Sequence, residues 1–194
     1  MTMPQSCPIA RTQNRTTLLI LTALFAALTA VGAWISIPLP FTTVPITLAT
    51  MGASLAGALL GPWYGSLSMI IYLLLGAVGA PVFHNMTGGL GILTGPTGGY
   101  LIGYITSALL CGFLINTMCK KDLAWWKVAI ASLAGLASCY ILGTIWFMIS
   151  SGTGLAASMM LCVVPFLPGD ALKTIAIVLL VKKLLPALNK ITAR

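Results

Sequence analysis

Two ionisable residues, Asp170 and Lys173, lie three positions apart at the start of the last apolar segment of this 194-residue sequence. Residues i and i+3 share one face of a helix, so a helix that begins near Pro168 would bring the two side chains together. Ionisable residues within membrane-spanning segments are rare and usually mark a substrate path. We therefore take the pair as the candidate site. The structural alternative is an ion pair that only holds the last helix to its neighbours.

The position of the pair in its helix indicates what it could bind. Pro168 can start a helix with its fixed φ, and Asp170 then falls in the first turn, where the helix dipole favours an anion. Lys173 opposes that dipole and so needs another reason to be there. Together with the free N–H groups of the helix start, Lys173 could receive a carboxylate while Asp170 accepts N–H donors. We therefore expect a small ligand with an acid at one end and N–H groups at the other.

The residue types needed for catalysis are missing from the sequence. It contains no glutamate, its only other acid is Asp122, and His84 is its only histidine. These numbers exclude a carboxylate pair, a two-histidine metal site and a Ser-His-Asp set on one side of a membrane. The five cysteines form no C-x-x-C motif, and their odd number argues against a disulfide framework. We predict no enzyme, no metal and no cofactor.

The composition is that of an integral membrane protein. Hydrophobic residues make up 59% of the chain and charged residues only 6%, whereas about 25% of a soluble domain is charged. A helical span needs ~20 residues, so the length allows about six spans and no soluble domain. The net charge of +8 comes from short clusters at segment ends, which indicates membrane anchors and no nucleic-acid partner.

Proline and glycine divide the apolar sequence into six predicted spans, at 16–36, 46–61, 63–80, 98–119, 124–150 and 164–185. The second and third are short and meet at Gly61-Pro62, which predicts a tight helical hairpin. The first apolar run is too long for the core of a signal peptide, so we expect it to be a retained span. The prediction is one all-α, six-helix transmembrane domain over 1–194, with tails at 1–15 and 186–194.

Basic residues orient these spans. Nine of the ten fall on one side of the predicted membrane: Arg11, Arg15, Lys120, Lys121, Lys127, Lys182, Lys183, Lys190 and Arg194. The loops on the other side, 37–45, 81–97 and 151–163, carry no basic residue. Since cytoplasmic loops carry the excess of lysine and arginine, both termini are predicted to be cytoplasmic.

The three outer loops are apolar and rich in proline and glycine. Irregular backbone at membrane depth must be buried in protein or line a cavity, so these loops should fold over the outer mouth of the bundle and close a ligand pocket. In the loop 81–97, Gly88, Gly89 and Gly91 would allow close approach of a ligand, and Asn85 would offer a polar contact. Three aromatic residues are candidate walls of the pocket or ordinary packing residues: Trp34, Tyr140 and Trp146.

Eight motifs occur in order along the chain: Ile37-Pro-Leu-Pro-Phe-Thr-Thr-Val-Pro-Ile-Thr47, Gly61-Pro62, Tyr72-Leu-Leu-Leu-Gly76, Pro81-Val-Phe83, Gly88-Gly89, Gly95-Pro-Thr-Gly-Gly-Tyr100, Tyr140-Ile-Leu-Gly-Thr-Ile-Trp146 and Pro165-Phe-Leu-Pro-Gly-Asp-Ala-Leu-Lys173. Together they resemble the BioY family, the biotin-specific S components of energy-coupling-factor (ECF) transporters. The resemblance runs without a break from about Ala23 to Lys183.

The resemblance implies a six-helix S-component fold that binds biotin from outside. Biotin carries a valerate carboxylate and a ureido ring with two N–H groups. Asp170 and Lys173 match the ligand-binding pair of the family, and the loop 88–99 matches its pocket-lining loop. Ala23 and Ala27, four residues apart on the first span, resemble the small-residue motif by which S components dock on the coupling protein, since close helix approach needs small residues. Ordinary helix packing is the alternative for these alanines.

The expected function is biotin uptake across the cytoplasmic membrane of a bacterium, as the high-affinity biotin-binding subunit of an ECF-type transporter. The expected partners are the lipid bilayer, biotin, and the coupling protein and ATPase subunits, or a second copy of the chain if it works alone. A secondary transporter of another small carboxylate-bearing vitamin or metabolite is the alternative function. A purely structural membrane protein would have no reason to keep Asp170 and Lys173 together.

Overall fold

The computed structural model describes residues 15–38, 40, 44–118 and 124–192. Five helical segments of this part are long and apolar enough to cross a membrane. Their helices are α1 (Arg15–Trp34), α2 (Ala49–Ala77), α4 (Gly98–Met118), α5 (Trp125–Ser151) and α7 (Leu167–Thr192). The fifth segment also includes the helix that precedes α7, which is α6 (Leu155–Cys162).

The helix α2 is bent into two limbs at Gly61-Pro62. Gly61 has φ 81° and ψ 179°, a conformation that favours glycine, and Pro62 has no N–H to continue the helical bonding. A Cβ added at Gly65 would lie 2.7 Å from the Cα of Gly57, so the second limb folds back against the first. Counted as two limbs, α2 completes the six membrane segments that were predicted, and the predicted hairpin is confirmed.

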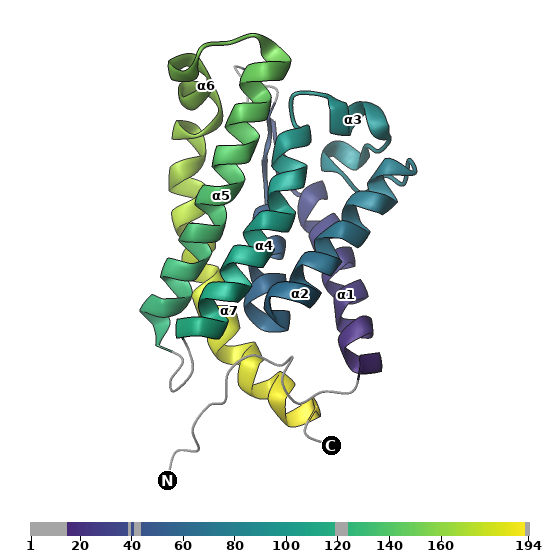
Figure 1. Cartoon of the computed structure of the whole chain (residues 1–194), viewed down its shortest axis with the longest axis vertical. Helices are drawn as coiled ribbons and strands as arrows, with labels where there is room; N and C mark the ends of the chain where they lie inside the picture. Colours follow the sequence, from purple (N-terminus) through teal and green to yellow (C-terminus); the bar gives the residue numbers. More distant parts are fainter. Residues whose placement is uncertain (1–14, 39, 41–43, 119–123, 193–194) are drawn as a thin grey trace.

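The bundle is built around α2 and α4, with α1 on one side and α5, α6 and α7 on the other (Figure 1). Small residues allow the two central helices to approach closely: a Cβ at Gly112 of α4 would lie 2.6 Å from the Pro62 nitrogen. On the other side of α2, the Ser68 hydroxyl donates a hydrogen bond to the Thr22 carbonyl of α1 at 2.9 Å. This framework fixes the helices that carry the site.

Large apolar side chains cover the outward faces of the helices. Among the exposed ones are Ile20, Leu75, Phe113, Ile145 and Leu179. A soluble monomer rarely exposes such continuous apolar surface. The chain is therefore a multi-pass membrane protein, as predicted.

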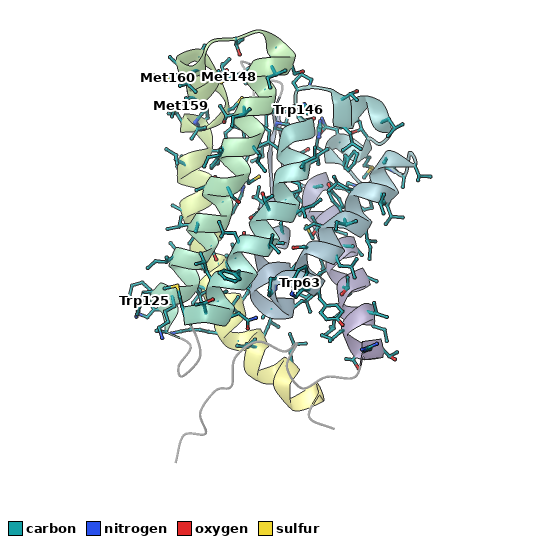
Figure 2. The ribbon with its side chains drawn as sticks, viewed as in Figure 1. Trp63, Trp125, Trp146, Met148, Met159 and Met160 are labelled. Atoms are coloured by element: carbon teal, nitrogen blue, oxygen red, sulfur yellow. The ribbon has the colours of Figure 1, made fainter. Side chains whose placement is uncertain are left out.

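Tryptophans mark one end of the bundle. Trp63 at the bend of α2 and Trp125 at the start of α5 lie toward that end in Figure 2, and their side chains are 80% and 61% exposed. Tryptophan is enriched at the membrane–water interface. The start of α1 and the end of α7 lie at this same end, while α3 and α6 lie at the other (Figure 1).

The outer segments contain more regular structure than their composition indicated. The first forms a two-residue antiparallel ladder of β1 (Ser36–Ile37) and β2 (Ile46–Thr47), a small exception to the all-α prediction. The other two contain η2 (His84–Met86), α3 (Leu90–Thr94), α6 and η3 (Val164–Phe166). Local helical hydrogen bonds satisfy backbone groups that lie away from water, which explains why these apolar loops become short helices.

Helix α7 differs slightly from its prediction. It begins at Leu167 rather than at 164, and it continues past Pro186 to Thr192, so most of the predicted C-terminal tail is helical. The last part of α7 (yellow) runs beneath α2 (Figure 1). Four of the basic residues used to orient the chain lie outside the described residues: Arg11, Lys120, Lys121 and Arg194.

Candidate ligand-binding site

The predicted pair of ionisable residues forms a buried ion pair. Asp170 lies in the first turn of α7, and Lys173 lies one turn further along the same face. The Lys173 Nζ is 3.0 Å from the Asp170 Oδ1, and the two side chains are 10% and 4% exposed. The Thr174 hydroxyl donates to the Asp170 carbonyl oxygen at 2.8 Å, which supports the same turn of the helix.

Two other helices contribute partners to this ion pair. The Tyr140 hydroxyl of α5 donates to the Asp170 Oδ2, and the Lys173 Nζ donates to the Thr50 Oγ1 of α2 at 3.3 Å. Buried charges need a counter-charge and further hydrogen bonds to offset the loss of water. Asp170 and Lys173 have both, supplied from three helices. Of the predicted site residues, the structure brings together Asp170, Lys173 and Tyr140.

A small cavity lies against the ion pair, and we call it the inner chamber. Its lining residues are Val44, Pro45, Thr47, Thr50, Tyr100, Tyr104, Leu136, Cys139, Tyr140, Phe166, Asp170 and Lys173. Pockets for small molecules are usually largely apolar with a few placed polar groups. The inner chamber has this character, with its charged groups at one place in the wall.

A second small cavity, the outer chamber, adjoins the first. Its lining residues are Ala33, Val44, Pro45, Thr47, Tyr72, His84, Thr97, Tyr100, Leu101 and Tyr104. Five of them also line the inner chamber: Val44, Pro45, Thr47, Tyr100 and Tyr104. The two chambers are therefore neighbours, and these five residues border both. Segments outside the spans contribute Val44, Pro45 and His84 to their walls, as the prediction of a loop-covered pocket required.

Two tryptophans and Asn85 hold the outer loop in place. The Trp34 Nε1 of α1 donates to the Pro81 carbonyl at 2.8 Å, and the Trp146 Nε1 of α5 donates to the Gly95 carbonyl at 3.0 Å. The Ser36 hydroxyl of β1 donates to the Asn85 Oδ1 at 2.8 Å. Neither tryptophan lines a chamber. Their role in the structure is to tie the loop to the ends of α1 and α5.

The three glycines of the outer loop differ in whether the structure requires a glycine at their position. A Cβ at Gly88 would overlap the Ala80 carbonyl, and Gly89 has φ +103°, which strains any other residue. A Cβ at Gly91 would meet nothing within 4 Å. None of the three is among the lining residues of the inner or outer chamber. Their contact with a ligand, like that of Asn85, stays a prediction.

His84 is the histidine that lines the outer chamber. It lies in η2, outside the spans, and its imidazole is half-buried in the protein. Burial disfavours the charged form and lowers the pKa of His84 below its usual 6.5. At neutral pH the imidazole is therefore uncharged.

Sequence reasoning missed several lining residues, among them Thr50, Tyr72, Tyr100 and Tyr104. A signal was present, because four of the five tyrosines in the chain line the two chambers. A tyrosine hydroxyl within an apolar span usually needs a hydrogen-bond partner or a polar cavity. The tyrosines were thus a sequence signal for the walls of the two chambers.

The predicted docking residues lie away from the site. Ala23 and Ala27 are exposed on the outward face of α1, next to the exposed Leu24 and Leu28. In Figure 1, α1 stands at the edge of the bundle. Since both alanines are exposed, packing against another helix of this chain does not explain them.

The fold is an apolar helical bundle with cavities beside a buried acid–base pair. Short helices and a β-ladder connect the spans at one end of the bundle. Together these features define a membrane protein with a candidate site for a small polar molecule. The sequence matches the BioY family over residues 3–190. The chain belongs to this family, whose members are transporter components and not enzymes.

Named relatives and a solved structure agree with this assignment. The biotin transporter BioY of Thermotoga maritima is 46% identical over 125 residues, covering 64% of this chain and 70% of that protein. The biotin transporter BioY of Rhodobacter capsulatus is 39% identical over 166 residues, covering 80% and 86%. A crystal structure of the S-component for biotin from an ECF-type ABC transporter superposes with a TM-score of 0.79 at 33% identity, covering 88% of this chain and 91% of that one. The predicted S-component fold is thus confirmed.

Proposed function

We propose that this chain captures biotin at the outer side of the cytoplasmic membrane of a bacterium and is the S component of an ECF-type biotin transporter. Its relatives are named as biotin transporters, and the similar crystal structure is that of a biotin S-component. The observation that carries the proposal is the cavity lined by the buried Asp170–Lys173 pair. The nine basic residues on one side support an orientation with both termini in the cytoplasm.

The geometry favours the ureido group of biotin as the group that binds the ion pair. Asp170 and Lys173 are 3.0 Å apart, so one ligand group can contact both. A cyclic urea presents two N–H donors beside one carbonyl acceptor. Asp170 accepts an N–H, since each carboxylate oxygen can accept more than one hydrogen bond, and Lys173 donates to the carbonyl. Tyr140 keeps the Asp170 carboxylate in position.

Charge supports the same orientation. A neutral urea adds no net charge to the ion pair, whereas a ligand carboxylate would place a second anion beside Asp170 in a buried site, where uncompensated charge is costly. The sequence led us to expect the carboxylate at Lys173 and the N–H groups at Asp170. That arrangement would bring both ends of biotin to one ion pair whose charged atoms are 3.0 Å apart, so the valerate chain would have to fold toward the ring. We therefore place the carboxylate away from the pair.

Ala23 and Ala27 are the proposed contact with a coupling protein. Both are small and exposed on α1, and small residues allow helices to approach closely. Ala23→Trp together with Ala27→Trp should abolish co-purification with the coupling and ATPase subunits and leave biotin binding unchanged. Ala137→Trp, at an exposed alanine of α5, is the matched control. If the α1 variant still co-purifies with the coupling and ATPase subunits, the docking surface lies elsewhere on the chain. If the parent co-purifies only with a second copy of itself, the chain works without these subunits.

Uptake of labelled biotin tests the proposed function. Cells without a biotin transporter of their own should accumulate biotin when they express this chain with coupling and ATPase subunits, and expression of the chain alone would show whether it also works without them. A secondary transporter of another small acid would accumulate that acid and leave biotin at the level of the empty vector. That result would contradict the proposal.

A further inference from the structure

The outward face of α7 changes from apolar to basic toward the C-terminal end of the helix. Leu172, Ile175 and Leu179 lie on this face and are 71%, 58% and 63% exposed, so they contact the acyl chains of the bilayer. Lys182 and Lys183 follow three and four positions after Leu179 and are also exposed. Residues three and four positions apart share one face of a helix. The two lysines therefore continue the lipid-facing stripe of α7.

The opposite face of α7 fixes the direction of these lysines. Ile177, Val181 and Leu185 are 3%, 0% and 1% exposed and belong to the hydrophobic core. Val181 and Leu185 flank Lys182 and Lys183 in the sequence, so a rotation that turned the lysines inward would expose core side chains. The two lysines therefore point away from the bundle.

The end of α7 reaches the headgroup region of the bilayer. The helix has 26 residues, and at 1.5 Å per residue it is about 39 Å long, whereas the hydrocarbon core is ~30 Å thick. Trp63 and Trp125, which mark the membrane–water interface, lie toward the same end of the bundle as the end of α7 (Figure 1, Figure 2). A lysine near the end of a membrane helix extends its ammonium group to this interface. The ammonium groups of Lys182 and Lys183 therefore lie level with the lipid headgroups.

The described part of the protein provides no counter-charge for these two lysines. Asp170 is the only acidic residue among the described residues, and it is buried in its pair with Lys173. An anionic phospholipid supplies a phosphate for the ammonium groups and acyl chains for the exposed Leu179 one turn earlier. A soluble anion would supply the charge alone. The register of the apolar and basic residues thus favours a lipid as the partner.

We propose that Lys182 and Lys183 bind the headgroup phosphate of an anionic phospholipid whose acyl chains lie along the outward face of α7. The proposed orientation places this lipid in the cytoplasmic leaflet, which attracts basic segments because its anionic lipids give it a negative surface potential. Only the choice of leaflet rests on the proposed function. The headgroup contact is independent of biotin.

Native mass spectrometry of the purified chain tests the inference. The chain is titrated in detergent, without biotin, with phosphatidylglycerol or with phosphatidylcholine of the same acyl chains, and the Kd of the first bound lipid is measured. The parent should bind phosphatidylglycerol more tightly. Lys182→Gln together with Lys183→Gln should raise that Kd about five- to twentyfold, since each lysine near an anionic lipid surface contributes roughly a factor of five. The Kd of phosphatidylcholine should not change.

Two further variants separate a site from a general effect of charge. Arg15→Gln together with Lys127→Gln removes two positive charges at the same end of the bundle, from α1 and α5, and should leave the preference for phosphatidylglycerol in place. Lys182→Arg together with Lys183→Arg keeps both charges and should bind phosphatidylglycerol like the parent. An equal loss in the α1 and α5 variant, or a parent without preference between the two lipids, would overturn the inference.

Thermal unfolding distinguishes a lipid from other anionic partners. Phosphatidylglycerol should raise the unfolding temperature of the parent more than that of the glutamine variant, and excess inorganic phosphate should raise neither. Equal stabilisation by inorganic phosphate would show a site for a soluble anion and would contradict a lipid site. If the glutamine variant keeps its preference for phosphatidylglycerol and instead fails to co-purify with the coupling and ATPase subunits, the lysines bind a protein and the inference is wrong. A parent that binds phosphatidylglycerol but no biotin would contradict only the proposed function.

Discussion

Replacing Lys173 with methionine should weaken biotin and biotin amide by the same factor. The account places the ureido oxygen at the Lys173 Nζ, and both ligands have this oxygen. A hydrogen bond to a charged group contributes about 1.5–3 kcal/mol, and the Lys173 side chain is only 10% exposed, so water replaces little of the contact. The Kd should therefore rise roughly ten- to a hundredfold for each ligand. Lys183→Met, at an exposed lysine further along α7, is the control and should change neither Kd.

Substitutions at Lys173 and Asp170 should also lower the stability of the protein, because they disrupt the buried ion pair. Removing one partner of a buried pair costs about 3–5 kcal/mol because the other charge stays buried. After Lys173→Met, the Tyr140 hydroxyl still donates to Asp170. The loss of stability of this variant should therefore lie toward the lower end of that range. After Asp170→Asn, the Lys173 ammonium keeps its hydrogen bond to the Thr50 hydroxyl but loses its counter-charge. This variant should therefore lose more stability than Lys173→Met. The variant with both substitutions should lose less stability than the sum of the two single losses, since it buries no unpaired charge.

Calorimetry with both ligands and thermal unfolding without ligand measure these effects on the same preparations. If Lys173→Met weakens biotin and leaves biotin amide unchanged, the lysine holds the carboxylate and the proposed orientation is reversed. If the variant with both substitutions binds biotin like the parent, the pair is only a structural ion bridge, and the ligand site must be sought around Asn85 and the outer loop.

Topology, packing and pH provide further tests. In a cysteine-free background, a cysteine at Thr153 should react with an impermeant reagent on intact cells and one at Lys183 only after permeabilisation; the reverse would contradict the orientation. Gly99→Ala should destabilise the fold by about 1–3 kcal/mol, because its Cβ would overlap an α5 side chain, whereas Gly91→Ala meets nothing within 4 Å and should unfold like the parent. Burial lowers the pKa of His84, so below pH 6.5 the unfolded chain binds more protons there than the folded protein. The unfolding temperature without ligand should fall on acidification from pH 7.5, and an equally steep fall in His84→Gln would contradict this.

The six membrane segments and the ion pair could be predicted from the sequence because their signals are local. Gly61-Pro62 breaks the helix wherever the rest of the chain lies, and an i,i+3 spacing on a helix brings Asp170 and Lys173 together without any tertiary contact. Clusters of basic residues report the orientation in the same local way.

The rest of the site depends on contacts between distant segments. Thr50 is 123 positions from Lys173, and no local pattern identifies it as a partner. Trp34 and Trp146 were candidate pocket walls, but their N–H groups bind loop carbonyls 47 and 51 positions away. Gly88 indicated a close approach of the backbone to a ligand, which stays a prediction, and the structure adds another reason for this glycine, a close approach to Ala80. Deciding whether such a residue lines the ligand pocket or holds a loop in place needs the packed structure, because the same residue type can do either.

Calorimetric titration of the purified, folded chain with biotin tests the central claim most directly. The account predicts saturable heat with one biotin bound per chain and a rise in the unfolding temperature, since a ligand that binds only the folded state stabilises it. Both effects should be lost in the variant that carries Asp170→Asn and Lys173→Met. No heat and no thermal stabilisation of the folded parent at any biotin concentration would contradict the account.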